Sequence, residues 1–365
     1  MHGSSGLMTR WSTIDNDNFL GDHHTPHGNE GSASEEASLL NNCYVLHCTR
    51  LMAKISTVLG NTTAASAFAQ QAEAHAAAIH SRWFNSSTSG YLDTRQGHLI
   101  LALVSGVVPP HLLKDVLATL RHEIHVTQAG HIDTGLTTTY FMYKYFADSS
   151  SGFGGHEDLA YTVTTAKGHP GYLDMLSNGT TFNENWGFCH DSGSCCAAAD
   201  YRKDCCQKVY ECRHYNGCPL NGACGSSSGS SSKIHGTLDG VGQLFVAGIG
   251  GIRRPLGGVG YQAISFEAPF DLTGGDFHAR ASFDSAYGTI VSSWATSGGV
   301  HTHNLTVPPN CEATVRIGGT RLTEGGAELA QREGVRGVRA CERDERMAVV
   351  NVGSGSFSFR GEVGS

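Results

Sequence analysis

A carboxylate and an indole lie two residues apart in the segment 180–186, and both side chains could take part in chemistry on a sugar. Glu184 can accept a proton from water, as a general base does. Trp186 can stack its ring on the apolar face of a pyranose. A lone Glu-x-Trp is more often a solvated loop residue beside a packing residue, so its meaning depends on the sequence around it.

The composition excludes several classes of partner. Charged residues make up 16% of the 365 residues and the net charge is -8. No run of Lys and Arg is long enough to follow a phosphate backbone, so we expect no nucleic acid partner. No apolar run has the length of a membrane span. The sequence indicates no cofactor.

Twelve cysteines fall into three even sets, which predicts a disulfide framework and an oxidising compartment. Two of the sets are pairs, Cys43 with Cys48 and Cys311 with Cys341. The third set contains Cys189, Cys195, Cys196, Cys205, Cys206, Cys212, Cys218 and Cys224. This set could instead bind zinc with nearby histidines, but it has no clear CxxC…CxxC or CxxC…HxxxH spacing. We therefore expect disulfides.

Four Asn-x-Ser/Thr sequons indicate the same compartment. Their asparagines are candidate glycosylation sites: Asn61, Asn85, Asn178 and Asn304. Together with the cysteines they predict an extracellular or lumenal protein. The first residues, MHGSSGLMTRW, lack the apolar stretch of a signal peptide. We expect the export signal to lie upstream of this chain.

Apolar residues at helical spacing predict a series of helices before about residue 255. The predicted helices cover residues 35–59, 64–84, 97–105, 110–125, 135–147, 156–167 and 236–248. Their short connections, rich in Gly, Ser and Pro, favour antiparallel helical hairpins in a bundle or a toroid. A cysteine-rich insertion at 188–232 interrupts the series.

Beyond about residue 257 the apolar pattern alternates, which predicts strands. The predicted strands cover residues 262–266, 279–283, 289–294, 304–307, 313–317, 347–352 and 356–360. Short strands separated by Gly and Pro turns are typical of an antiparallel β-sandwich. We therefore expect an α domain over residues 1–255 and a β domain over residues 256–365, with the bridge between Cys311 and Cys341 closing a loop of the sandwich.

The order of short motifs along the chain resembles the C-terminal half of the α-L-rhamnosidases of glycoside hydrolase family 78. Residues 180–186 are similar to the family's Thr-Thr-x-x-Glu-x-Trp, and residues 232–235 resemble its Ser-x-x-His. Gly21-Asp22 resembles the start of its Gly-Asp-Trp, and residues 130–135 its Thr-Gly helix start. Residues 158–161 resemble the helix that leads to the active-site loop.

This resemblance implies a mainly α plus β fold, with a partial (α/α)6 toroid followed by a C-terminal β-sandwich. It implies a carbohydrate substrate and inverting hydrolysis of terminal α-L-rhamnosides. In that reaction one carboxylate activates water and a second protonates the leaving oxygen. The match to the family loop implies that Glu184 is the general base. Trp186, His235 and Asp22 would contact the sugar.

Departures from the family pattern lead to an alternative. The family's general acid lies in an Arg-Asp-Glu-Arg-type segment upstream of Gly-Asp-Trp, so we expect the acid upstream of this chain. His23 stands where the family has Trp, and Asn185 where it has Arg. The alternative is an inactive carbohydrate-binding or structural extracellular glycoprotein on the same scaffold.

Other polar residues near the matched motifs could supply an acid or a metal site. For the carboxylates Asp22, Glu30, Glu35 and Asp133, a structural role such as helix capping is expected. The histidines at 23, 24 and 27 follow an aspartate, but they lack the spacing of a protease zinc site. We therefore expect no metal.

Overall fold

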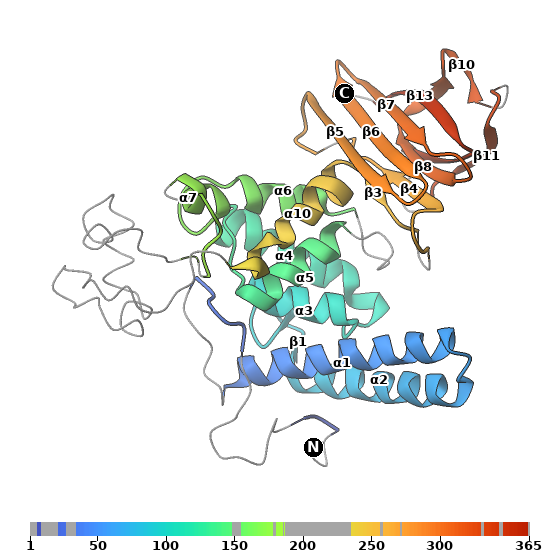
Figure 1. The fold of residues 1–365 in the computed structure, drawn as a ribbon. Helices are drawn as coiled ribbons and strands as arrows, with labels where there is room; N and C mark the ends of the chain where they lie inside the picture. The colour runs from blue at the N-terminus through green and yellow to red at the C-terminus, as the bar shows by residue number, and fades with distance from the viewer. Residues whose placement is uncertain are drawn as a thin grey trace. The chain divides into compact units, whose positions relative to one another are not determined.

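The computed structural model describes residues 6–8, 21–26, 34–147, 155–177, 180–184, 186, 235–255, 258–270, 272–329, 332–342 and 346–363. They form two compact units (Figure 1). The first comprises Met1–Met142 with Thr162–Asp239, and the second comprises Tyr143–Tyr161 with Gly240–Ser365. The first unit is helical and the second is built mainly of strands. The predicted combination of a helical part followed by a β part is confirmed.

Two long helices, α1 (Glu35–Val58) and α2 (Thr62–Trp83), lie side by side in the first unit (Figure 1). The Ser34 hydroxyl accepts a hydrogen bond from the Ala37 amide at 3.1 Å, so a side chain caps the first turn of α1. A left-handed Gly60 follows α1 and turns the chain into α2. His75 Nε2 lies 2.8 Å from Asn42 Oδ1, and this buried contact joins the two helices.

The other predicted helices are also present, but those at 110–125 and 236–248 are each divided into three shorter segments, and α7 (Tyr172–Ser177) was not among the predicted helices. The remaining helical segments are α3 (Gln96–Ser105), η1 (Pro110–Leu112), α4 (Leu113–His122), η2 (Glu123–Thr127), α5 (Leu136–Ala147), α6 (Glu157–Thr165), α7, η4 (Gly236–Gly240), α10 (Val241–Gln243) and η5 (Leu244–Ile249). The sequence did not predict the short hairpin of β1 (Phe84–Asn85) and β2 (Gly90–Tyr91). Nearly every residue of α3 is buried, as expected for a helix that is apolar on all sides.

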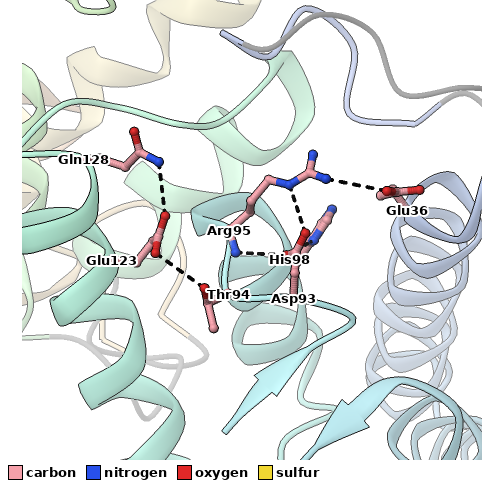
Figure 2. A network of polar contacts seen from close by, with 7 residues as sticks. All are labelled: Glu36, Asp93, Thr94, Arg95, His98, Glu123 and Gln128. Carbon is pink, nitrogen blue, oxygen red and sulfur yellow. Dashed lines mark hydrogen bonds and ion pairs between the residues drawn. The ribbon is translucent and has the colours of Figure 1, made fainter. Parts of the chain in front are cut away.

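A polar network surrounds the N-terminus of α3 (Figure 2). Asp93 accepts hydrogen bonds from the Arg95 amide at 2.9 Å and from His98 Nδ1 at 2.7 Å. Burial alone would raise the pKa of Asp93, but the hydrogen bond and charge of His98, helped by Arg95, lower it to about 2. Arg95 also reaches Glu36 of α1 at 3.5 Å, so the network ties α3 to α1.

The second unit contains two sheets. Its strands are β3 (Ile252–Arg253), β4 (Ala263–Glu267), β5 (Phe277–Ser285), β6 (Gly288–Ser297), β7 (Val300–Val307), β8 (Glu312–Gly318), β9 (Thr320–Glu324), β10 (Ala327–Glu328), β11 (Val335–Ala340), β12 (Met347–Val352) and β13 (Gly355–Glu362). One sheet has the order β10-β9-β13-β7-β6-β5 and the other β11-β12-β8-β4-β3. All pairs are antiparallel except β4 with β8, which are parallel. The predicted sandwich therefore contains one parallel pair.

The core of the second unit lies between these sheets. Ile290, Leu305 and Phe359 of one sheet share a cluster with Phe266 and Val315 of the other. Strands β7 and β13 alternate between buried and more exposed positions, as strands with one face on the core do.

Two histidines of β7 also point into this core. His301 and His303 are fully buried, with ring centroids 6.2 Å apart. Burial lowers the pKa of His301 to about 4, and burial with the neighbouring His301 lowers that of His303 to about 3. Both rings are therefore uncharged at neutral pH.

A buried ion network joins α6 to the sheets within the second unit. Arg253 Nη1 lies 2.8 Å from Glu267 Oε2, and Arg253 Nη2 also contacts Glu157 of α6. Glu267 in turn contacts Arg316 of β8. The guanidinium of Arg253 is thus paired with two carboxylates, which compensates for its removal from water.

The predicted disulfides between Cys43 and Cys48 and between Cys311 and Cys341 are wrong, because these four cysteines carry free thiols. Cys43 and Cys48 are five residues apart on α1, which separates them by a rise of about 7.5 Å and about 140° around the axis. A disulfide needs Cα atoms within about 7 Å.

Strand register separates the other pair. Cys311 precedes Ala313, which lies opposite Val352, whereas the Cys341 amide donates to the Met347 carbonyl at 3.0 Å. Met347 and Val352 are the two ends of β12, so the cysteines lie roughly 16 Å apart along that strand. The cysteines between 189 and 224 lie outside the described residues.

Three of the four candidate glycosylation sites are described, and all three are exposed. Asn61 caps α2 by accepting from the Ala64 amide at 3.0 Å, and Asn85 accepts from the Ser87 amide at 3.0 Å. Asn304 lies on the solvent face of β7. Asn178 lies outside the described residues. Glycosylation at these sites stays a prediction.

Within the described ranges, no helix combines the length and the apolar character needed to cross a membrane.

Candidate functional site

Aromatic packing anchors the loop that carries Glu184. The Trp186 indole donates a hydrogen bond to the Thr134 carbonyl at 2.7 Å and is 4% exposed. Its ring meets Tyr172 edge to face at a centroid distance of 5.1 Å, and Phe182 meets the same tyrosine at 5.3 Å. The loop is therefore fixed on both sides of Glu184.

The same anchor brings a distant segment beside the loop. The His235 amide donates to the Phe182 carbonyl at 3.0 Å, and the Tyr172 hydroxyl donates to the Leu238 carbonyl at 3.0 Å. These two bonds hold the start of η4 against the loop. His235 therefore lies close to Glu184, as the sequence motifs predict.

Three histidines surround the Glu184 carboxylate. Glu184 Oε1 lies 3.4 Å from His24 Nε2 and 3.9 Å from His235 Nε2. Ligand atoms of His23, His24 and Glu184 all lie within 4.8 Å of one another. We call these four residues the histidine–carboxylate cluster. The side chain of Glu184 is 21% exposed, so solvent reaches the carboxylate.

An unusual backbone conformation places two adjacent histidines on the same side. His24 has φ 60°, in the left-handed region that non-glycine residues seldom adopt. The ring centroids of His23 and His24 lie 3.8 Å apart, and both rings face Glu184. In an extended chain, successive side chains would point to opposite sides.

Burial keeps these imidazoles uncharged. It lowers the pKa of His24 to about 4, with His23 acting in the same direction and Glu184 opposing. It also lowers the pKa of His23, against the attraction of Glu184. At neutral pH both rings therefore offer lone pairs and N–H groups to their surroundings, rather than positive charges.

Asp22 supports the cluster through the start of α5. Its carboxylate accepts hydrogen bonds from the Gly135 amide at 2.6 Å and the Thr138 amide at 3.2 Å, and from the Thr138 hydroxyl. This is an N-cap supplied by a residue far away in the sequence. A Cβ on Gly135 would lie 2.7 Å from Asp22 Cγ and would also strike the His23 carbonyl, so only glycine fits there.

The structure brings together some of the predicted site residues and gives others a different setting. Glu184 and His235 are neighbours. The buried indole of Trp186 anchors the loop through Thr134, and its predicted contact with a sugar stays a prediction. Asp22 is 2% exposed and caps α5, and its contact with a sugar stays a prediction.

Two of the remaining acid candidates, Glu35 and Asp133, make hydrogen bonds within the helical unit. Glu35 accepts hydrogen bonds from Trp83 Nε1 at 2.6 Å and from Arg82 at 2.6 Å. The Trp83 hydrogen bond lowers the pKa of Glu35 despite partial burial, so it is a poor proton donor. Asp133 is buried beside α3, where its amide donates to Gln96 Oε1 at 2.9 Å. Glu30 lies outside the described residues.

Sequence reasoning did not predict that His23 and His24 lie beside Glu184. The only available signal was a His-His pair immediately after Gly21-Asp22. Spacing along the sequence cannot show that a carboxylate from a distant loop lies beside these two rings.

Comparison with known proteins decides the family. A family model described as the bacterial α-L-rhamnosidase six-hairpin glycosidase domain matches residues 4–203, more than half of the chain. The chain belongs to the bacterial α-L-rhamnosidase family. A second model, the bacterial α-L-rhamnosidase C-terminal domain, matches residues 251–330.

Three α-L-rhamnosidases resemble this chain in sequence or in structure. An α-L-rhamnosidase of Formosa agariphila is 22% identical over 243 residues, which cover 66% of this chain and 20% of that protein. The solved α-L-rhamnosidase from Dictyoglumus thermophilum has a TM-score of 0.72 and 22% identity, covering 94% of this chain and 34% of that one. The Streptomyces avermitilis α-L-rhamnosidase, complexed with L-rhamnose, has a TM-score of 0.70 and 21% identity. The match covers 99% of this chain and 29% of that one.

These overlaps define how much of a family member the chain contains. It spans 20% of the curated relative and 34% and 29% of the two solved chains. The likeness in structure establishes the same fold over nearly the whole of this chain.

Proposed function

We propose that the chain contributes the general-base side of an α-L-rhamnosidase active site, with Glu184 as the base. The observation that carries this proposal is the setting of Glu184. Its carboxylate is 21% exposed, lies 3.4 Å from His24 and 3.9 Å from His235, and stands on a loop that resembles the family's active-site loop. A carboxylate in contact with both solvent and fixed polar groups can take a proton from an attacking water.

The proposed reaction is inverting hydrolysis of a terminal α-L-rhamnoside. Glu184 removes a proton from water as that water attacks the anomeric carbon from the face opposite the leaving group. A second carboxylic acid, about 6.5 to 9.5 Å away, protonates the leaving oxygen. The proposed source of this acid is the family segment that precedes Gly-Asp-Trp.

His235 is proposed to hold the sugar. Its side chain is 30% exposed and its Nε2 lies near the carboxylate of Glu184. An imidazole there can hydrogen-bond a sugar hydroxyl while the base engages water. The hydrogen bond from its backbone amide to the Phe182 carbonyl holds His235 beside the loop.

The proposal is tested by hydrolysis of an aryl α-L-rhamnoside by the full-length protein and by its Glu184→Gln variant. Loss of the base should reduce kcat by roughly 10² to 10⁴. Glu73→Gln makes the same change on a surface carboxylate that is 75% exposed, and should leave the rate unchanged. Proton NMR of the first product should show the inverted anomer. Equal rates for wild type and Glu184→Gln would remove Glu184 from the mechanism.

A second candidate is a carbohydrate-binding glycoprotein without catalysis. It is favoured by the composition of the histidine–carboxylate cluster, which has one carboxylate and in which His23 replaces the family's Trp. Titration with L-rhamnose should then show binding, and incubation with the aryl rhamnoside should release no product. Turnover that disappears in Glu184→Gln would contradict it.

We propose an extracellular or lumenal location on the basis of the four sequons and the eight cysteines between 189 and 224. The free thiols of Cys43, Cys48, Cys311 and Cys341 do not contribute to this argument. Treatment of the native protein with a peptide N-glycosidase should reduce its apparent mass. An unchanged mass would contradict glycosylation.

A further inference from the structure

The donor atoms of the histidine–carboxylate cluster match those of a transition-metal site. The imidazole rings of His23 and His24 and the carboxylate of Glu184 place their ligand atoms within 4.8 Å of one another. Two histidines and a glutamate form a known zinc ligand set, with metal–ligand distances of about 2.0 to 2.2 Å. Ca²⁺ and Mg²⁺ prefer sites made only of oxygen ligands, so the two imidazoles favour zinc-like ions.

The backbone holds these donors in place independently of any ligand. His24 keeps a left-handed φ of 60°, a conformation that persists only where the surroundings impose it. The preceding His23 carbonyl accepts a hydrogen bond from the Leu136 amide at 2.8 Å. Asp22, one residue earlier, is bound to the first turn of α5. The two rings are thus presented together from an anchored segment.

Only a small rearrangement would close the site around an ion. Tetrahedral zinc with such bond lengths has ligand atoms about 3.3 to 3.6 Å apart. Glu184 Oε1 already lies 3.4 Å from His24 Nε2. His235 Nε2 lies 3.9 Å from the same oxygen, close enough to become a fourth ligand after a small movement. The partial exposure of Glu184 and His235 leaves a path for the ion.

We propose that His23, His24 and Glu184 bind a divalent transition-metal ion of the zinc type. Bound there, the ion takes the carboxylate lone pairs with which Glu184 would accept a proton from water. Zinc should therefore inhibit hydrolysis, a consequence that rests on the proposed function. The binding itself does not depend on that function, and it revises the expectation from sequence that no metal binds.

The test is titration of the purified chain with Co²⁺ and Zn²⁺ at neutral pH. Co²⁺ held by imidazole and carboxylate gives visible ligand-field bands without the charge-transfer bands of thiolate ligands, which separates this site from the cysteines. Wild type should bind one more ion at such a site than either Glu184→Gln or His23→Ala. Since loss of an outer-shell partner alone weakens metal affinity about 10- to 100-fold, loss of a direct ligand should cost at least that.

Controls separate the site from surface histidines and from misfolding. The double change His122→Ala and His125→Ala removes two exposed histidines of α4 and η2, and should leave the Co²⁺ bands unchanged. Circular dichroism checks that each variant is folded, and His23, being only half-buried, is the safer change. Equal stoichiometry and affinity in wild type, Glu184→Gln and His23→Ala would overturn the proposal. A chain that binds Co²⁺ at this site and hydrolyses no rhamnoside would support the metal site and contradict the proposed function.

Discussion

Glu184 Oε1 lies 3.4 Å from Nε2 of His24, although His24 precedes α1 and Glu184 follows α7. The contact depends on two separate anchors. Asp22 binds the first turn of α5, and the Trp186 indole binds the carbonyl of Thr134 immediately before it. The start of α5 is therefore the common support of both partners.

Trp186→Phe should weaken the loop anchor without leaving a large cavity. The change keeps an aromatic ring beside Tyr172 but leaves the buried Thr134 carbonyl without its donor, at a cost of about 1 to 3 kcal/mol. Urea unfolding should show the loss. In hydrolysis assays kcat should fall because Glu184 is less well held. A rise in KM with unchanged kcat and stability would instead indicate that the indole binds the sugar directly.

Gly135→Ala should displace the segment that carries His23 and His24 of the histidine–carboxylate cluster. The new Cβ would strike the His23 carbonyl and lie 2.7 Å from Asp22 Cγ, so the segment carrying both histidines must shift. Such overpacking costs about 1 to 3 kcal/mol. Thermal unfolding measures this cost, and Co²⁺ titration measures the accompanying loss of metal affinity.

Gly242→Ala is the matched control for that change. A Cβ on Gly242 would meet nothing within 4 Å, so the variant should be at least as stable as wild type. Equal effects of the two glycine changes would show that the close contact at Gly135 is unimportant.

Arg253→Ala should destabilise the second unit strongly. The arginine is 5% exposed, and its removal leaves Glu157 and Glu267 as buried carboxylates without its charge. Breaking a buried pair in this way costs about 3 to 5 kcal/mol. Arg321→Ala removes an 80% exposed partner of Glu362 and should cost no more than about 1 kcal/mol. Chemical denaturation of both variants compares the two, and similar losses would contradict the structural role of Arg253.

Acid should destabilise the β unit through His301 and His303. Their folded pKa values, about 4 and about 3, lie below the unfolded value near 6.5, so the folded state resists protonation. The stability they contribute is fully present above pH 6.5 and is lost as the pH falls through the interval down to about 3. The loss should amount to a few kcal/mol by pH 4.

Calorimetry between pH 7 and pH 4 checks this prediction. A variant with His301→Gln and His303→Gln has no group to titrate at these positions, so its stability should fall less steeply over that interval. Parallel curves for wild type and the double variant would assign the acid sensitivity to other groups.

Local signals in the sequence predict most of the elements. Ser34 and Gly60 mark the ends of α1, and apolar spacing locates α3 and α5, because helix formation depends on neighbours within a turn or two. Alternation locates β6 and β7 because each has one buried face. It misses β11, an edge strand with little burial on either face, which therefore carries almost no apolar pattern.

Sequence by itself also determined the family, because an ordered series of motifs survives at low identity. The same motifs single out Glu184 and His235 as candidate site residues. Only the tertiary structure decided what surrounds them. Register keeps Cys311 and Cys341 apart, and packing against Tyr172 buries Trp186. The left-handed turn at His24 directs two histidines at Glu184. Each of these depends on contacts between segments distant in the chain, which spacing along the sequence does not encode.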